Sequence, residues 1–356
     1  MFTVIAVGNA PFKNSHPFLT GRYRQILRAT VRSYIDTAEP VGSKMLTQQY
    51  NFGLSPATIR NAMSALESWG LLFQPHTSAG RIPSDSGYRV YVDELLAPPT
   101  ELVQQMRLAL QENLANRQEL EHLLHSATRL LATLSGCVAM ITAPQSASVT
   151  VRHLQIVNLG EGRAMVIVIT DALQTRSFLL DLPHPEMAEE LEILNNYLNI
   201  QLQSRHLSEI KPEEGSDQFH WYAEFLNKLV ALLQQVLQPP IAQLYVSGVG
   251  EILRQPEFAE PERIQAIVQL LEDERERIGP LMNSQNPMGR IVVRIGAENP
   301  LEPMQFCSMV FGNYYRNDVP IGSIGVLGPT RLPYERAIAS VEAATQHLSH
   351  VMRVEE

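Results

Sequence analysis

At 356 residues the chain exceeds what one hydrophobic core usually serves, so we expect two or three domains. Its 45% hydrophobic and 18% charged residues are typical of a folded protein, and no apolar run reaches the ~18 residues needed to cross a membrane. Only two cysteines, Cys137 and Cys307, are present, which excludes a disulfide framework and favours a reducing, cytoplasmic compartment.

The net charge of −9 is unevenly distributed along the chain. Residues 1–92 hold nine Lys or Arg side chains against four Asp or Glu, which leaves this part at +5. The remaining residues hold 19 basic and 33 acidic side chains and therefore stand at −14. A basic head on an acidic body predicts that any surface for binding phosphates lies in the head.

The first predicted elements are an extension and two helices. Residues 1–20 are mildly apolar at the start but make a poor signal peptide, and we expect a flexible extension. A helix is predicted over Gly21–Asp36 and is ended by a proline and a glycine. Ser43 is the expected N-cap of a short second helix over Lys44–Tyr50.

A third helix is predicted from Ser55-Pro56, a strong helix start, to Trp69. Its core face, at 100° per residue, is formed by Ile59, Ala62, Met63 and Leu66. The opposite face is small and polar, and it carries residue types that read base edges in the major groove of DNA. The side chains expected to contact DNA from this helix are Ser55, Ala57, Thr58, Arg60, Asn61 and Ser64.

A β-hairpin is predicted to follow this helix. Leu71–Gln74 has the pattern of a strand, His76–Arg81 is a tight polar turn, and Ile82–Tyr91 is the returning segment. A hairpin in this place forms a wing, whose tip can reach phosphates or the minor groove. The further side chains expected to contact DNA, from the second helix and the wing, are Ser43, Lys44, His76, Thr77, Ser78 and Arg81.

Beyond residue 96 the pattern predicts one α+β domain with an insertion. A connecting amphipathic helix is expected over Glu101–Leu134. Strands are predicted between residues 137 and 180 and again between residues 290 and 327, whereas the stretch 185–286 is mainly helical. A sheet that begins before residue 180 and resumes after residue 290 indicates that the helical stretch interrupts a single domain.

Three runs in the head, Glu39–Lys44, Leu54–Asn61 and Pro75–Pro83, closely resemble the HrcA family of bacterial heat-inducible transcription repressors. The last run is the most specific, because winged helices in general do not share it. The similarity extends through segments at Ser247–Leu253, Pro256–Phe258, Gly296, Glu298-Asn299, Cys307-Ser308, Gly325–Arg331 and Tyr334. It therefore covers nearly the whole chain from residue 21.

The resemblance implies an α+β multidomain protein with a particular architecture. After the extension at 1–20, residues 21–96 would form a winged helix-turn-helix DNA-binding domain. Residues 100–184 and 287–356 would form a GAF-like domain. A mainly helical dimerisation domain at 185–286 would be inserted into it, in agreement with the interrupted sheet.

The resemblance also implies a function. A member of this family would bind double-stranded DNA as a homodimer, at an inverted repeat upstream of chaperonin and chaperone heat-shock operons. Its activity would be modulated by the chaperonin GroEL. The alternative is a winged-helix regulator controlled by a small ligand bound in the GAF-like domain.

Other chemistry finds little support in the residues. Cys137 and Cys307 lie in apolar strands, where a free cysteine is usually a small core side chain. His122 and His125 share a helix face without further spaced ligands, which favours a solvated face over a zinc site. We therefore expect a protein that is not an enzyme and that uses no cofactor and no metal.

Overall fold

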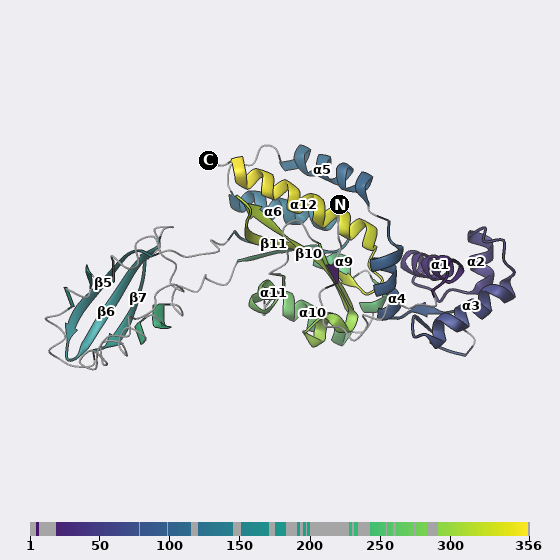
Figure 1. Ribbon diagram of the computed structural model, residues 1–356, viewed down its shortest axis with the longest axis horizontal. Coiled ribbons are helices and arrows are strands. Elements are labelled where there is room, and N and C mark those ends of the chain that lie inside the picture. Colours follow the sequence, from purple (N-terminus) through teal and green to yellow (C-terminus); the bar gives the residue numbers. More distant parts are fainter. Residues whose placement is uncertain are drawn as a thin grey trace. The chain divides into compact units, whose positions relative to one another are not determined.

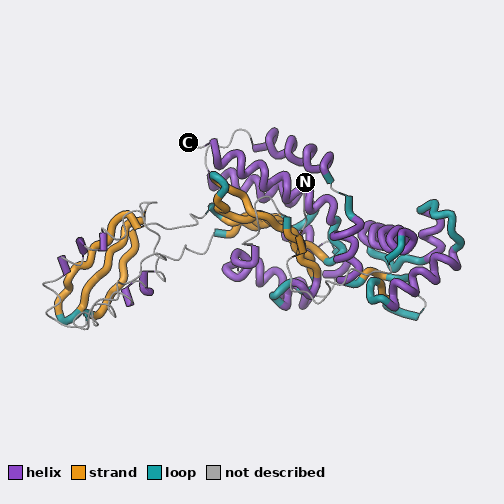
Figure 2. Tube along the Cα trace, in the orientation of Figure 1, coloured by secondary structure: helices purple, strands orange, loops and turns teal. Residues whose placement is uncertain are grey.

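The computed structural model contains both helices and strands, as expected for an α+β fold (Figures 1 and 2). It describes residues 5–6, 19–77, 79–97, 99–114, 120–144, 151–170, 175–182, 243–253, 255–258, 261–272, 275–282 and 291–354, with short pieces at 191–192, 195–196, 198–199, 228–229 and 231–233. The contacts divide the chain into two compact units, one formed by residues 1–144 and 242–356 and the other by residues 145–241.

The head of the first unit is built from three helices and a short hairpin. The helices are α1 (Gly21–Thr37), α2 (Ser43–Gln49) and α3 (Pro56–Ser68), and the antiparallel strands are β2 (Leu72–Phe73) and β3 (Ile82–Pro83). This is the order of elements that the sequence predicted. The predicted core face of α3 is confirmed, because Ile59, Ala62, Met63 and Leu66 are all buried.

Two local predictions in the head are wrong. Gly42 rather than Ser43 occupies the N-cap position of α2, and Ser43 is a buried residue of the first helical turn. The returning segment of the hairpin does not run to Tyr91, since α4 (Asp85–Val90) and the π-helical turn η1 (Tyr91–Leu95) follow directly. The Ser84 hydroxyl starts α4 by accepting a hydrogen bond from the Gly87 backbone N–H at 3.1 Å.

The body of the first unit is a six-stranded sheet in the order β1-β9-β10-β11-β4-β8. Its strands are β1 (Ile5–Ala6), β4 (Val138–Thr142), β8 (Leu244–Ser247), β9 (Val292–Ile295), β10 (Cys307–Arg316) and β11 (Val319–Pro329). The predicted connecting helix is present as α5 (Thr100–Leu114) and α6 (Leu120–Ser135). The remaining helices are α9 (Val249–Leu253), α10 (Pro261–Glu272), α11 (Arg275–Met282) and α12 (Tyr334–Val354), with 3-10 turns η4 (Pro256–Phe258), η5 (Gly296–Glu298) and η6 (Glu302–Met304).

Helices cover both faces of this sheet (Figure 1). Side chains alternate along a strand, so neighbouring residues of β4 serve different cores. Ala139 and Ile141 belong to the core shared with α6 and α12, whereas Val138 and Met140 belong to the core shared with α10 and α11. Burial on both faces explains why the strands read as continuous apolar runs.

The expectation that residues 1–20 form a flexible extension is wrong for Ile5–Ala6. These residues form β1, which pairs in parallel with β9, with Ile5 opposite Val292. The edge of β9 presents unpaired backbone groups, and an extended segment can satisfy them whatever its side chains are.

The second unit contains a separate antiparallel sheet in the order β5-β6-β7. Its strands are β5 (Val151–Gly160), β6 (Arg163–Thr170) and β7 (Thr175–Asp181). Asn195 and Asn199 cover the free edge of β5: their side chains donate to and accept from the backbones of Ile156 and Leu154 at 2.6–3.0 Å. Two amides thereby satisfy an edge that would otherwise be open to pairing.

The inserted unit therefore has other limits than those expected at 185 and 286. Strands β5–β7 were assigned to the interrupted domain, but among the strands that the structure describes they pair with one another, and they lie in unit 145–241. Conversely, β8 pairs with β4, and α10 and α11 cover the sheet of the first unit. Strand pattern along the chain does not say which strands pair, and this is why the boundary was misplaced. The described part of the inserted unit contains a sheet, so it is not only helical.

Candidate nucleic-acid interface

The outward face of α3 is available to a partner. Ala57, Arg60, Asn61 and Ser64 are exposed, and none of the first-turn residues of this helix is acidic. The helix starts as predicted, since the Ser55 side chain accepts a hydrogen bond from the Thr58 backbone N–H at 3.2 Å. The exposed first turn carries no acidic residue, and the exposed Arg60 side chain follows it. This surface is therefore suitable for contact with the phosphates and bases of DNA.

Ser55 and Thr58 also serve the helix itself. Their hydroxyl groups lie 2.9 Å apart and share a hydrogen bond, in addition to the N-cap interaction. Thr58 is half-buried, whereas its neighbours on the outward face are exposed. Of the six residues predicted to contact DNA from this helix, these two thus also form the hydrogen bonds that start it.

The turn of the hairpin presents His76 and Thr77, both exposed. Ser78, the third residue predicted there, lies outside the described residues. Gln74 fixes the turn, because its side-chain N–H₂ donates to the backbone oxygens of Thr77 at 3.0 Å and Ala79 at 2.9 Å. Gln74 was not among the predicted residues, since a glutamine beside a polar turn carries no distinguishing pattern.

Arg81 lies at the base of the hairpin rather than at its tip. Its Nε donates to the Glu67 carboxylate on α3 at 2.8 Å, and its side chain is mostly buried. Its backbone pairs with that of Val41, with two N–H···O bonds of 2.9 Å. Arg81 therefore fastens the hairpin to α3 and to the segment before α2, a role that the pattern of the sequence did not indicate.

The hairpin closely approaches the segment before α2 at Gly80. A Cβ atom at this position would lie 2.4 Å from the backbone oxygen of Val41, so only glycine fits without movement. A small cavity of about 150 Å³ remains beside it, lined by residues of the α2 start, α3 and the hairpin, including Ser43 and Arg60. Lys44 is exposed at the start of α2, whereas Ser43 faces this cavity.

The two cysteines are core residues. Both are buried, and burial raises the pKa of the Cys137 and Cys307 thiols to about 12. A thiol held protonated in this way is a poor nucleophile and a poor metal ligand. Within the described ranges, no group of three His, Cys, Asp or Glu residues is placed to hold a metal ion.

Among the helices that the structure describes, none is both long and apolar enough to cross a membrane.

Three helices and a hairpin, with a polar face on the third helix whose first turn carries no acidic residue, are typical of helix-turn-helix regulators. Residues 121–338, more than half of the chain, match the family described as HrcA protein C terminal domain. The chain is also 75% identical over 342 residues to the heat-inducible transcription repressor HrcA of Gloeobacter violaceus, with 95% of each chain covered. It is 48% identical to the repressor of the same name from Trichormus variabilis, covering 93% of this chain and 98% of that one. The chain belongs to the HrcA family of heat-inducible transcription repressors, and the resemblance noted in the sequence is confirmed.

A solved structure shares the fold. It is described as the crystal structure of a hypothetical protein at 2.2 Å resolution, and it is 23% identical with a TM-score of 0.55. The similarity covers 94% of this chain and 98% of that one, so the fold extends through both units.

Proposed function

We propose that the chain represses heat-shock transcription by binding, as a homodimer, an inverted repeat upstream of chaperonin and chaperone operons. The observation that carries this proposal is the exposed polar face of α3, with no acidic residue in its first turn, in a chain of the HrcA family. The two relatives are named heat-inducible transcription repressors, and binding to DNA is the usual way in which a transcription repressor acts.

We assign residues 21–96 to a winged helix-turn-helix, with β2 and β3 as the wing. On α3, Arg60 would bind guanine through its two-pronged guanidinium, and Asn61 would bind adenine. Ala57 offers a small apolar contact for the methyl group of thymine. Ser64, one helical turn further along and also exposed, would extend the contact on the same face. The short and neutral side chains of Ala57 and Ser64, which are exposed on the same face, would let the backbone of α3 approach the groove.

The phosphate contacts come from around this helix. Lys44 is exposed at the start of α2, and His76 and Thr77 are exposed at the turn of the wing. These side chains flank α3 and would fix its register on the duplex without reading bases. Ser55, Thr58, Ser78 and Ser43 remain proposed contributors, the last at the margin of the interface because its side chain is buried.

The body would supply dimerisation and control. We assign the six-stranded sheet with its helices to a GAF-like domain, and the unit at 145–241 to the inserted dimerisation domain. A twofold dimer presents two copies of α3, so its symmetry calls for an inverted repeat in the DNA.

Control by the chaperonin GroEL would explain the heat response. A chaperonin that binds the native repressor stabilises it by mass action, and misfolded proteins that occupy the chaperonin withdraw this support. The word heat-inducible in the names of the relatives is consistent with such a release of repression.

Binding to two duplexes tests the DNA proposal. One duplex carries the inverted repeat from upstream of a chaperonin operon, and the other has the same bases in shuffled order. We expect selective binding to the repeat, with an affinity that falls steeply as salt is raised and Lys and Arg lose their phosphate contacts. Equal affinity for the two duplexes would reject the proposal.

The chaperonin and the small-ligand alternative are separated by a second titration. Repeat binding is measured after heating and cooling, with chaperonin alone and with chaperonin saturated by an unfolded protein. We expect recovery of binding only with the free chaperonin. Recovery that depends instead on a small-molecule extract, with or without chaperonin, would favour a ligand bound in the body.

A further inference from the structure

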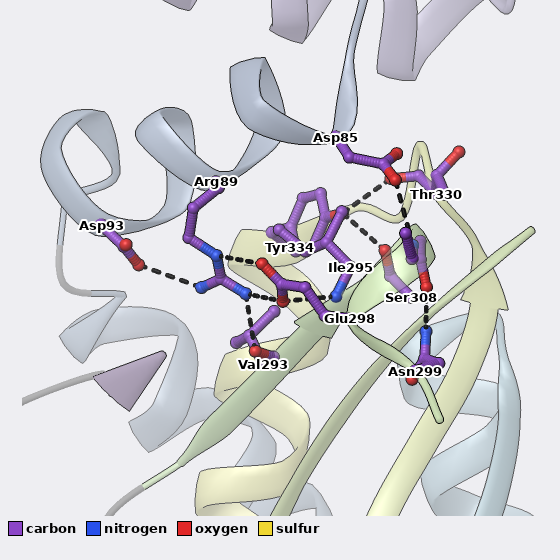
Figure 3. A network of polar contacts seen from close by, with 12 residues as sticks. Asp85, Arg89, Asp93, Val293, Ile295, Glu298, Asn299, Ser308, Thr330 and Tyr334 are labelled. Carbon is purple, nitrogen blue, oxygen red and sulfur yellow. Dashed lines mark hydrogen bonds and ion pairs between the residues drawn. The ribbon is translucent and has the colours of Figure 1, made fainter. Parts of the chain in front are cut away.

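Two arginines join the head to the body of the first unit. The first is Arg89 on α4, whose side chain is buried. Figure 3 shows its polar contacts. Its Nε donates to Glu298 at 2.9 Å, its Nη2 donates to the backbone oxygen of Val293 at 2.8 Å and also to Glu298, and its Nη1 donates to Asp93 at 3.1 Å. Three of these four contacts cross from the head to β9 and η5 of the body.

The receiving side is arranged for this contact. The Glu298 carboxylate also accepts the backbone N–H of Ile295 at 2.9 Å, so the body itself holds it in place. Beside it the Asp85 carboxylate on α4 accepts the Ala297 backbone N–H at 3.1 Å. Gly296 lies between them at a φ of 51°, and a Cβ atom there would come within 2.0 Å of the Asp85 carboxylate. The head therefore rests directly on the backbone of η5.

The second arginine is Arg331, between β11 and α12, and its side chain extends from the body to the head. Its Nη1 donates to the backbone oxygen of Ile35 at 3.0 Å, and its Nη2 donates to Gln255 at 2.7 Å. Its Nε pairs with Glu257. Ile35 lies in the last turn of α1, where backbone oxygens have no partner within the helix, so Arg331 caps α1 from the body.

The two contacts hold the head at two separated elements, α1 and α4. Between them the rings of Tyr88 and Tyr334 pack with their centres 5.8 Å apart. Both arginine side chains are largely buried, and an ion pair in such surroundings is costly to break because it leaves a charge without a partner. A head held in this way cannot swing freely on the body.

We propose that Arg89 and Arg331 are positioning residues for operator recognition, which fix the orientation of the head so that the two α3 helices of a dimer match the spacing of the half-sites. This inference rests on the proposed function. Neither arginine belongs to the outward face of α3, so they affect spacing and not base choice. A freely swinging head would bind one half-site equally well, but its second contact would lose the gain that a fixed geometry gives.

The test compares full-length variants on three duplexes: a single half-site, the inverted repeat, and the repeat with its centre lengthened by about half a helical turn, roughly five base pairs. Arg331→Met is the main variant, and Arg89→Lys is a milder second variant that keeps the charge beside Glu298. Arg353→Met is the matched control. It removes an exposed arginine that pairs with Asp318 at 3.3 Å and takes no part in the contacts between head and body.

For Arg331→Met and Arg89→Lys we expect half-site affinity within about twofold of the wild type and roughly tenfold weaker binding to the repeat. The preference for the natural spacing over the lengthened one should shrink, whereas Arg353→Met should leave all three affinities unchanged. Undiminished spacing preference in Arg331→Met would overturn the proposal. An equal loss on the half-site would also overturn it, because the arginine would then only support the folding of the head.

A measurement without DNA separates this proposal from the proposed function. Spin labels are placed at Gln48→Cys on α2 and Gln305→Cys on the body, both exposed positions, while Cys137 and Cys307 are buried. We expect a narrow distance distribution in the wild type and a broad one with Arg331→Met. Equally narrow distributions would overturn the proposal. A wild-type chain that did not select the repeat would instead reject the proposed function.

Discussion

Arg60 and Asn61 are adjacent in the sequence and are both exposed on α3, whose other face is buried. At the scale of single residues, α3 therefore has one buried apolar face and one exposed polar face. Ile59 and Met63 are buried, so the polar side chains between them have a defined direction. The periodicity of the sequence predicted this division, because 100° per residue is a property of any α-helix.

Replacement of Arg60 or Asn61 by alanine should weaken base selection. A side chain bound to a base through two hydrogen bonds contributes about 1–3 kcal/mol to discrimination, so each variant should bind the repeat ~5–150-fold less tightly. Binding to shuffled DNA should change little. Competition between the two duplexes measures the effect, and Ser68→Ala, at the exposed far end of α3, is the control. Unchanged discrimination in Arg60→Ala would show that α3 is presented differently.

Arg81 and Lys44 should differ in their response to salt. Arg81 is held by Glu67, so Arg81→Ala should weaken binding to every duplex by loosening the wing, with the salt dependence unchanged. Lys44 is exposed, so Lys44→Ala should remove a phosphate contact and lower the slope of log affinity against log salt by about one. Salt titrations of both variants check this. A reduced slope for Arg81→Ala would place its guanidinium on the DNA.

At the scale of elements, the hairpin β2–β3 is held in place by contacts that the strand pattern of its sequence does not indicate. The hairpin has only two residues in each strand, and a hairpin of that length is not stable alone. It is held by Arg81 at its base, by Gln74 within its turn and by the approach of Gly80 to Val41. The string His76–Pro83 that named the family thus includes the residues that attach the wing.

Gly80→Ala should therefore displace the wing. Its Cβ atom would lie 2.4 Å from the Val41 backbone oxygen, which is not a flexible side-chain end and must be pushed aside. We expect a loss of about 1–3 kcal/mol of stability, the usual cost of overpacking, and weaker binding to all duplexes. Urea unfolding and duplex titration measure these effects. Gly21→Ala is the control, because a Cβ atom there meets nothing within 4 Å and should be close to neutral.

The whole molecule is one folded unit with a second unit inserted between two paired strands. Thr142 at the end of β4 lies opposite Leu244 at the start of β8, and the Ala143 backbone N–H donates to the Gln243 oxygen at 2.8 Å. The two ends of the insertion therefore meet as the ends of a β-hairpin. Two antiparallel strands joined in this way need only a short turn.

Replacement of residues 145–241 by Asn-Gly should leave the first unit folded. We expect a cooperative unfolding transition for the shortened chain, and a monomer where the full chain is a dimer. Affinity for a half-site should persist, while the gain from the second half-site should be lost. Sedimentation and duplex titration measure both. A shortened chain that remains dimeric would place the dimer contact outside the inserted unit.

Local sequence was sufficient for the first three helices, the N-cap of α3, its buried face and the place of the hairpin, because neighbouring residues and helical periodicity determine these features. It was also sufficient for the family, through the run at 75–83 and the later segments. Local sequence did not determine the limits of the inserted unit. Apolar alternation marks a strand, but it does not say whether β4 will pair with β5 or with β8.

Only the tertiary structure decided which distant groups meet. Arg331 contacts the backbone of Ile35 across 296 positions of the chain, and Arg89 contacts Glu298 across 209. Neither pair has a spacing that a sequence pattern could reveal. The amino-acid sequence by itself thus determined the exposed polar surface of α3, which we propose contacts DNA, since that surface is a property of one helix. The position of that surface relative to the body is fixed by long-range contacts, and these exist only once the sheet of the body has formed.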